Sequence, residues 1–176
     1  LTVLQKQLRS TGALFQDLTK QSPHVFTCIV DSGCSYSATN SFHDVDPASV
    51  RRLSTPITLG GIAGSLSIEY VGRANWETLD DAGNLISFDE DVLIHPELPD
   101  RLLSPQSFLA RNGKSKDPSS HFRVYHDHAE LHRDGSKLLT MEYDASYLPR
   151  LVLFSKGAAI STLSSFTSVL HPNNSN

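Results

Sequence analysis

The sequence FTCIVDSGCS, at residues 26–35, joins a short apolar run to a turn built from small residues. The apolar run predicts a buried strand, and Asp31 follows it directly. Gly33 permits backbone conformations that other residues avoid, and the hydroxyl of Ser32 can bond across a loop. We therefore expect this stretch to present one carboxylate on a tight turn at the end of a core strand.

A carboxylate on such a turn is how an aspartic peptidase presents its catalytic acid. Aspartic proteolysis needs two carboxylates that share one proton, because two close negative charges cannot both ionise. The chain has one apolar-Asp-Ser-Gly stretch, and Asp134-Gly135 lacks the intervening hydroxyl residue. A catalytic Asp31 therefore implies a homodimer, whereas an ordinary turn, for which Asp-Ser-Gly is also common, implies no partner.

Length and composition limit the possible functions. The 176 residues fit one domain, and the net charge of −4 offers no overall attraction to nucleic acid or anionic membranes. No apolar run approaches the ~18 residues that span a bilayer. Cys28 and Cys34 are too few for a disulfide scaffold and lack the paired spacing of a zinc site. We expect a cytoplasmic protein with no metal, no cofactor, no direct nucleic-acid partner and no membrane contact.

The chain between residues 25 and 154 consists of short apolar runs separated by Gly, Pro, Asn and Asp, which predicts a mainly β fold. Ser104 as N-cap, Pro105 at the first helical position and Asn112-Gly113 as the stop predict one short helix. Turns are expected at residues 80–83 and at Asp134-Gly135. The expected strands cover residues 25–30, 57–59, 66–71, 73–79, 85–94, 122–125, 129–132 and 137–143. Their order suits a small closed barrel.

The same patterns divide the chain into three parts. Residues 1–22 predict an N-terminal linker or marginal helix, because apolar residues recur there at roughly helical spacing. Residues 23–155 form the expected domain. Residues 156–176 are rich in Ser, Thr and Asn and predict a C-terminal linker, so both tails are expected to be poorly ordered.

A glycine-rich segment lies about 30 residues after Asp31, between two expected strands. Its residues predict a flexible hairpin: Gly60, Gly61, Ile62, Ala63 and Gly64. A peptidase of this type needs such a flap, which opens to admit an extended peptide and closes to exclude water. An ordinary glycine-rich surface hairpin is the alternative.

Residues 91–109, DVLIHPELPDRLLSPQSFL, complete a three-part pattern. The chain resembles the peptidase segment of copia-type LTR retrotransposon polyproteins. That pattern runs from an apolar-Asp-Ser-Gly-Ala turn, through a glycine-containing flap, to a block similar to DVLYVPxLxxNLLSVSQL. The resemblance covers roughly residues 23–154, and the end of the chain looks like the linker before a pre-integrase region. Cys34 stands where the pattern has Ala, and Arg101 where Asn is common.

The resemblance implies a closed retropepsin-like barrel and a function. Asp31 would be the catalytic acid and base, Ser32 would bond across the dimer, and Gly33 would shape the turn. The segment behind the turn would be Leu102, Leu103 and Ser104. The implied protein is a homodimeric aspartic endopeptidase that cleaves polyprotein peptides, its own precursor included, in the cytoplasm or in virus-like particles. The alternative is a catalytically silent retropepsin-like module for dimerisation or peptide binding.

Two further side-chain groups have competing interpretations. Four histidines near one meander suggest zinc, but a bend near Asp127 would splay them around a turn, and solvated loop histidines are the preferred interpretation. They are His121, His126, His128 and His132. Cys34 is small enough to pack in the turn, and a redox-sensitive thiol beside Asp31 is its second interpretation.

Overall fold

The computed structural model describes residues 22–61, 64–112 and 118–159, with twelve strands and the short helix α3 (Pro105–Asn112). The expected mainly β fold with one short internal helix is therefore confirmed. Several expectations lie outside the described residues: the N-terminal linker or helix over residues 1–21, the tail over residues 160–176, Ile62 and Ala63 of the flap, and Gly113 of the helix stop.

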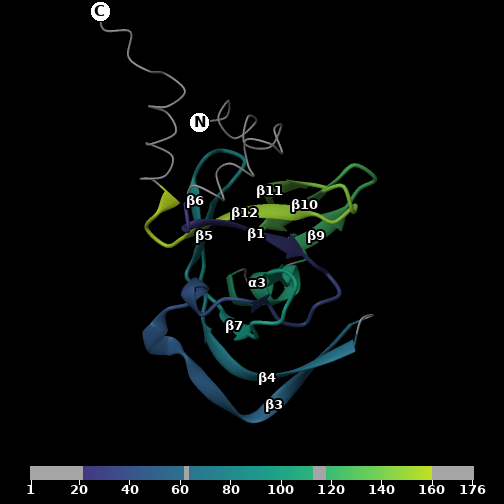
Figure 1. The fold of residues 1–176 in the computed structure, drawn as a ribbon. Helices are drawn as coiled ribbons and strands as arrows, with labels where there is room; N and C mark the ends of the chain where they lie inside the picture. The colour runs from purple at the N-terminus through teal and green to yellow at the C-terminus, as the bar shows by residue number, and fades with distance from the viewer. Residues whose placement is uncertain (1–21, 62–63, 113–117, 160–176) are drawn as a thin grey trace, which may run out of the picture.

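Nine strands form the main sheet, in the order β3-β4-β7-β2-β8-β1-β12-β5-β6. Figure 1 shows the β3–β4 hairpin at one end of the molecule and β1, β12 and β5 at the other. The strands are β1 (Val25–Val30), β2 (Ala38–Thr39), β3 (Arg51–Gly61), β4 (Gly64–Arg73), β5 (Trp76–Leu79), β6 (Leu85–Phe88), β7 (Asp91–Ile94), β8 (Leu102–Leu103) and β12 (Arg150–Ser155).

The expected closure into a barrel is wrong, because the two ends of this sheet do not meet. Among the described residues no strand pairs with the free edge of β3 or of β6. A closed barrel needs a regular tilt and stagger carried from strand to strand. The middle of this sheet depends on β2 and β8, which are two residues long each, so little continuous ladder is available to carry that stagger.

The centre of the sheet has a crossed arrangement that determines where Asp31 lies. β8 pairs in parallel with β1, through Ile29 with Leu102 and Val30 with Leu103. β8 also pairs with β2, which in turn runs parallel to β7. The short β8 is thus inserted between the strands that precede and follow the Asp31 turn.

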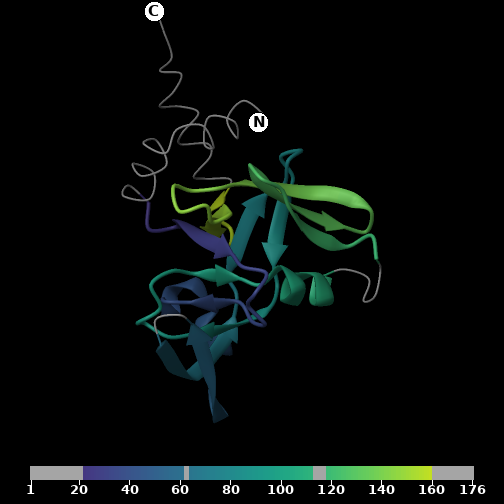
Figure 2. The ribbon, with the colours of Figure 1, turned by 90° about the vertical axis from the view of Figure 1, so that its right-hand side faces the viewer.

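Three further strands form a separate antiparallel meander: β9 (His121–Val124), β10 (His128–Arg133) and β11 (Ser136–Glu142). Figure 2 shows this meander above α3, with the β3–β4 hairpin on the far side of the helix. One core joins meander, helix and main sheet, and its largest fully buried members include Trp76, Phe88, Phe108, Leu131 and Leu153.

Most predicted strands are present, but β2, β8 and β12 were not predicted, and two predicted strands are shorter than expected. The expected strand over residues 85–94 is broken at Asp89 and Glu90, so that β6 pairs with β5 while β7 pairs with β4. The expected strand over residues 73–79 likewise begins only at Trp76. The turn at Asp134-Gly135 is confirmed, with φ of 50° and 80° at its two residues.

Candidate active site

Asp31 lies immediately after β1, where the chain leaves the core. The strand buries alternate side chains, and Val30 is only 2% exposed, whereas Asp31 itself is partly exposed. The amide of Asp31 donates a hydrogen bond of 3.0 Å to the carbonyl of Leu103. The parallel pairing of β1 with β8 thus continues one residue further and fixes the backbone of the candidate catalytic residue.

The turn that follows is closed by the Asp31 side chain and backbone. Oδ1 of Asp31 accepts from the amide of Gly33 at 2.8 Å, and its carbonyl accepts from the amide of Cys34 at 3.2 Å. A Cβ on Gly33 would lie 3.1 Å from Oδ1, tighter than nine in ten natural Cβ contacts. A larger residue here would therefore require the Asp31 carboxylate to shift by a few tenths of an ångström. Ser32 is exposed and accessible to a partner molecule.

The start of α3 holds the turn from behind. The buried Ser104 donates through Oγ to the carbonyl of Cys34 at 2.7 Å, and the same oxygen accepts from the amide of Ser107 at 3.2 Å as a helix cap. Nε2 of Gln106 donates to the carbonyl of Ser32 at 2.8 Å. Leu102 and Leu103 thus lie on β8 beside the end of β1, and Ser104 lies against the turn itself.

Cys34 contacts the carboxylate itself. Its Sγ donates to Oδ2 of Asp31 at 3.2 Å, so each carboxylate oxygen receives one donor from the turn. The pKa of the Cys34 thiol is raised to about 12, first by burial and then by the hydrogen bond to Asp31 and the charge of Asp31. A thiol with this pKa stays protonated and poorly nucleophilic at neutral pH, which disfavours the redox-sensor interpretation.

The glycine-rich segment forms the end of the long β3–β4 hairpin. The strands pair from Arg51 with Val71 to Gly61 with Gly64, and the ladder is irregular between Arg52 and Ile57. A Cβ on Gly60 would have open space around it, and Gly64 has a φ of 134°, which residues other than glycine rarely adopt. In Figure 1 this end of the hairpin and the loop after β1 reach the same side of the molecule.

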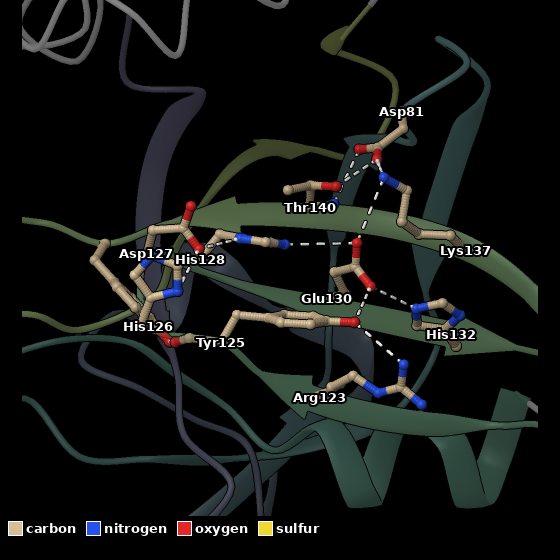
Figure 3. Close-up of polar contacts among 11 residues, drawn as sticks. Asp81, Arg123, Tyr125, His126, Asp127, His128, Glu130, His132, Lys137 and Thr140 are labelled. Atoms are coloured by element: carbon tan, nitrogen blue, oxygen red, sulfur yellow. Dashed lines mark hydrogen bonds and ion pairs between the residues drawn. The ribbon is translucent and has the colours of Figure 1, made fainter.

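The four histidines of the meander do not form a metal site. His121 and His132 stack with ring centroids 4.6 Å apart, while His128 and His132 lie on either side of Glu130 (Figure 3). His126 is almost fully exposed beside Asp127. No group of three or more His, Cys, Asp or Glu side chains in the described parts of the chain could hold a metal ion.

Two contacts of the turn were not anticipated from the sequence. Gln106 carries no sequence signal for its bond to Ser32, since an exposed glutamine in the first turn of a helix is unremarkable. Glu90 is fully buried behind the turn, although it stands in the run Asp89-Glu90-Asp91, which reads as a solvated charge cluster. Glu90 differs from its two acidic neighbours in its buried contacts with Ser37 and Ser107, which the sequence does not indicate.

No protein-family model matches the chain, and no curated protein or solved structure matches it either. Among the described residues, no helix has the length and apolar character that crossing a membrane requires.

Proposed function

We propose that the chain is an aspartic endopeptidase of a retrotransposon polyprotein, active as a homodimer. The observation that carries the proposal is the setting of Asp31. Its carboxylate is partly exposed at the end of a buried strand, on a turn held by Leu103, Ser104 and Gln106. A carboxylate held this firmly at the surface suits a group that must keep its orientation during a reaction.

The open position of Ser32 and Asp31 supports a dimeric site. The described residues contain one Asp-Ser-Gly turn, so a pair of catalytic carboxylates needs a second copy. With the partner's Asp31 across a two-fold axis, the two carboxyl groups share one proton and titrate as a coupled pair. The long β3–β4 hairpin supplies a flap over the peptide, and backbone groups at its glycines bind the extended substrate.

The reaction follows from the shared proton. The ionised carboxylate accepts a proton from water, whose oxygen forms a bond to the scissile carbonyl carbon. The protonated partner carboxyl donates a hydrogen bond to the oxyanion that develops. When the C–N bond breaks, the leaving amine takes up a proton from the dyad, and both halves of the substrate depart. The dyad returns to its singly protonated state.

Expression of a longer precursor, with and without Asp31→Asn, tests this function. The substitution keeps the size of the side chain and its acceptor for the Gly33 amide, so the variant folds and dimerises. We expect self-cleavage of the unchanged precursor, inhibited by a statine-type compound, and none from the variant. Equal processing of both precursors would contradict the proposal, whereas dimers of both without cleavage would leave the silent binding module.

A further inference from the structure

Glu90 is a buried acid close to the candidate active turn that the proposed reaction does not use. It lies between β6 and β7 and is 0% exposed, whereas the side chains of its neighbours Asp89 and Asp91 are 72% and 33% exposed. Burial of a carboxyl group is unfavourable unless hydrogen bonds satisfy it. The partners of Glu90 therefore indicate what the burial achieves.

Both carboxylate oxygens of Glu90 accept from serine hydroxyls on other segments. Oε1 accepts from Oγ of Ser37 at 2.9 Å, and Oε2 accepts from Oγ of Ser107 at 2.7 Å. Ser37 lies between the Asp31 turn and β2, and Ser107 lies in the first turn of α3. One side chain thus connects the segment that follows the turn with the helix that backs it.

The connection continues through Ser37 to the start of the helix. Oγ of Ser37 also accepts from the amide of Ser104 at 3.0 Å, and Ser104 in turn donates to the carbonyl of Cys34 at 2.7 Å. Glu90, Ser37, Ser104 and Cys34 therefore form one chain of hydrogen bonds behind Asp31. Movement of the Glu90 carboxylate would release its bonds to Ser37 and to Ser107 and so loosen the contact between this chain of hydrogen bonds and α3.

Burial, hydrogen bonds and nearby charges have opposing effects on the pKa of Glu90. Burial raises the pKa of Glu90, while the hydrogen bonds from Ser107 and Ser37 and the charge of Arg111 oppose that rise, and Asp91 adds to it. The Ser107 bond also places the carboxylate at the amino-terminal end of α3, where a negative charge is favoured. The contacts with Ser37 and Ser107 require a side chain long enough to reach both hydroxyls, more than they require a negative charge.

We propose that Glu90 is a positioning residue, which holds the Asp31 turn against α3 by spanning Ser37 and Ser107. This inference rests on the proposed function for the part that concerns cleavage. It predicts that side-chain length matters more than charge. Glutamine preserves the length, accepts at one end and donates at the other, whereas aspartate keeps the charge but is one methylene too short to reach both hydroxyls.

Hydrogen exchange in the whole chain tests the inference with Glu90→Gln and Glu90→Asp. The reporters are the amides of Asp31 and Ser104, measured relative to core amides of β10, which report global unfolding. We expect Glu90→Asp to exchange at least about ten-fold faster at both reporters, as for a lost buried hydrogen bond, and Glu90→Gln to exchange as the unchanged chain does. Equal behaviour of the two variants would overturn the inference.

Glu77 provides the matched control, because it is also a buried glutamate, 4% exposed, on β5. Its Oε2 accepts from the amide of Gly157 at 2.9 Å and does not contact the turn. We expect Glu77→Asp to leave the ratio of reporter to core exchange unchanged. Faster exchange at Asp31 and Ser104 in this control would show a general effect of shortening a buried acid and would overturn the inference.

Cleavage kinetics add a second readout. We expect Glu90→Asp to lower kcat at least about ten-fold with little change in KM, because misplacement of the reacting group impairs the chemical step. Glu90→Gln should keep kcat close to that of the unchanged chain. Equal kcat for both variants would contradict the positioning role. If Asp31→Asn cleaves normally, the proposed function fails, and the exchange ranking still decides the role of Glu90.

Discussion

The thiol of Cys34 donates a hydrogen bond to Oδ2 of Asp31 over 3.2 Å. The other oxygen, Oδ1, accepts from the amide of Gly33, so the turn itself satisfies both oxygens of the carboxylate. A side chain held at both oxygens has little rotational freedom, and its position in the single chain is already close to fixed. The dimer then has to bring together two oriented groups and not two mobile ones.

The raised pKa of Cys34 predicts slow alkylation. The thiolate is the reactive form, and a pKa of about 12 in place of the ordinary 9.0 leaves about a thousand-fold less of it at pH 7. We expect iodoacetamide to modify Cys34 slowly in the folded protein, faster as the pH rises towards 12, and rapidly in urea. Tandem mass spectrometry distinguishes Cys34 from the fully buried Cys28. Fast labelling of folded Cys34 at pH 7 would contradict a thiol kept protonated by burial and by its contact with Asp31.

Gly33→Ala should impair cleavage more than stability. The new Cβ would lie 3.1 Å from Oδ1 and push the carboxylate from its position. We expect at least about a ten-fold loss of kcat with a loss of about 1 kcal/mol in the free energy of unfolding. Gly60→Ala is the control, because nothing lies within 4 Å of a Cβ there. Matching kinetics for the two alanine variants would argue against a role for Gly33 in placing Asp31.

The ion pair of Arg101 with Asp44 should contribute substantially to stability. Asp44 is 5% exposed and also accepts from Thr39, while the Arg101 guanidinium lies 4.6 Å from the ring centroid of Phe26. Arg101→Ala leaves a buried carboxylate unpaired, and we expect a loss of about 3 kcal/mol in urea unfolding. The exposed Arg52, paired with Glu69, is the control, and Arg52→Ala should cost less than about 0.5 kcal/mol. Equal losses of unfolding free energy in the two variants would contradict the claim that burial of Asp44 makes the Arg101 pair the more important one.

Glu130 on the meander should make stability depend on pH in the acid range. Nε2 of His132 lies 2.8 Å from Oε2 of Glu130, and this hydrogen bond, followed by that from Tyr125, lowers the pKa of Glu130 (Figure 3). A lowered pKa in the folded state contributes stability above the ordinary value of 4.5, and that stability is lost as the pH falls below it.

Melting temperatures measured against pH check this expectation. Glu130→Gln should lower Tm above pH 4.5, and the difference should shrink at lower pH. Glu142→Gln, at an exposed glutamate on β11, should leave the curve unchanged. A difference between Glu130→Gln and the unchanged chain that grows towards low pH would have the wrong sign.

Local patterns were sufficient to predict several elements. The bounds of β1 follow from one apolar run before Asp31, and α3 from Ser104 and Pro105 at its start. In each case the deciding residues lie within a few positions of one another, so the signal and the structure that it predicts are on the same short segment.

Long-range pairing could not be predicted in this way. β12 pairs with β1 across most of the chain, from Val25 with Phe154 to Ile29 with Arg150, and no local pattern indicates that partner. The strands β2 and β8, of two residues each, are too short to show an alternation of apolar and polar residues. The closed barrel was expected from the order of the longer runs and from the resemblance, whereas the open sheet order includes β2 and β8 at its centre.

The candidate site divides in the same manner. Asp31, Ser32 and Gly33 are contiguous and were candidates from the sequence, whereas Gln106 contacts the turn, and Glu90 the segment after it, from distant parts of the chain. In the run Asp89-Glu90-Asp91 the middle residue lies in the break between β6 and β7, and it is buried against Ser37 and Ser107, which are distant in the sequence. No local pattern indicates those two partners.

The central claim is that Asp31 acts with its own copy, and mixed dimers test it most directly. Equal amounts of the unchanged chain and Asp31→Asn are unfolded together, refolded and assayed on a peptide substrate. Random pairing leaves about one quarter of the dimers with two aspartates, so activity should fall to about half of that from the same amount of unchanged chain refolded alone. Activity that does not fall when the variant is added would show that each chain works alone and would contradict the shared dyad.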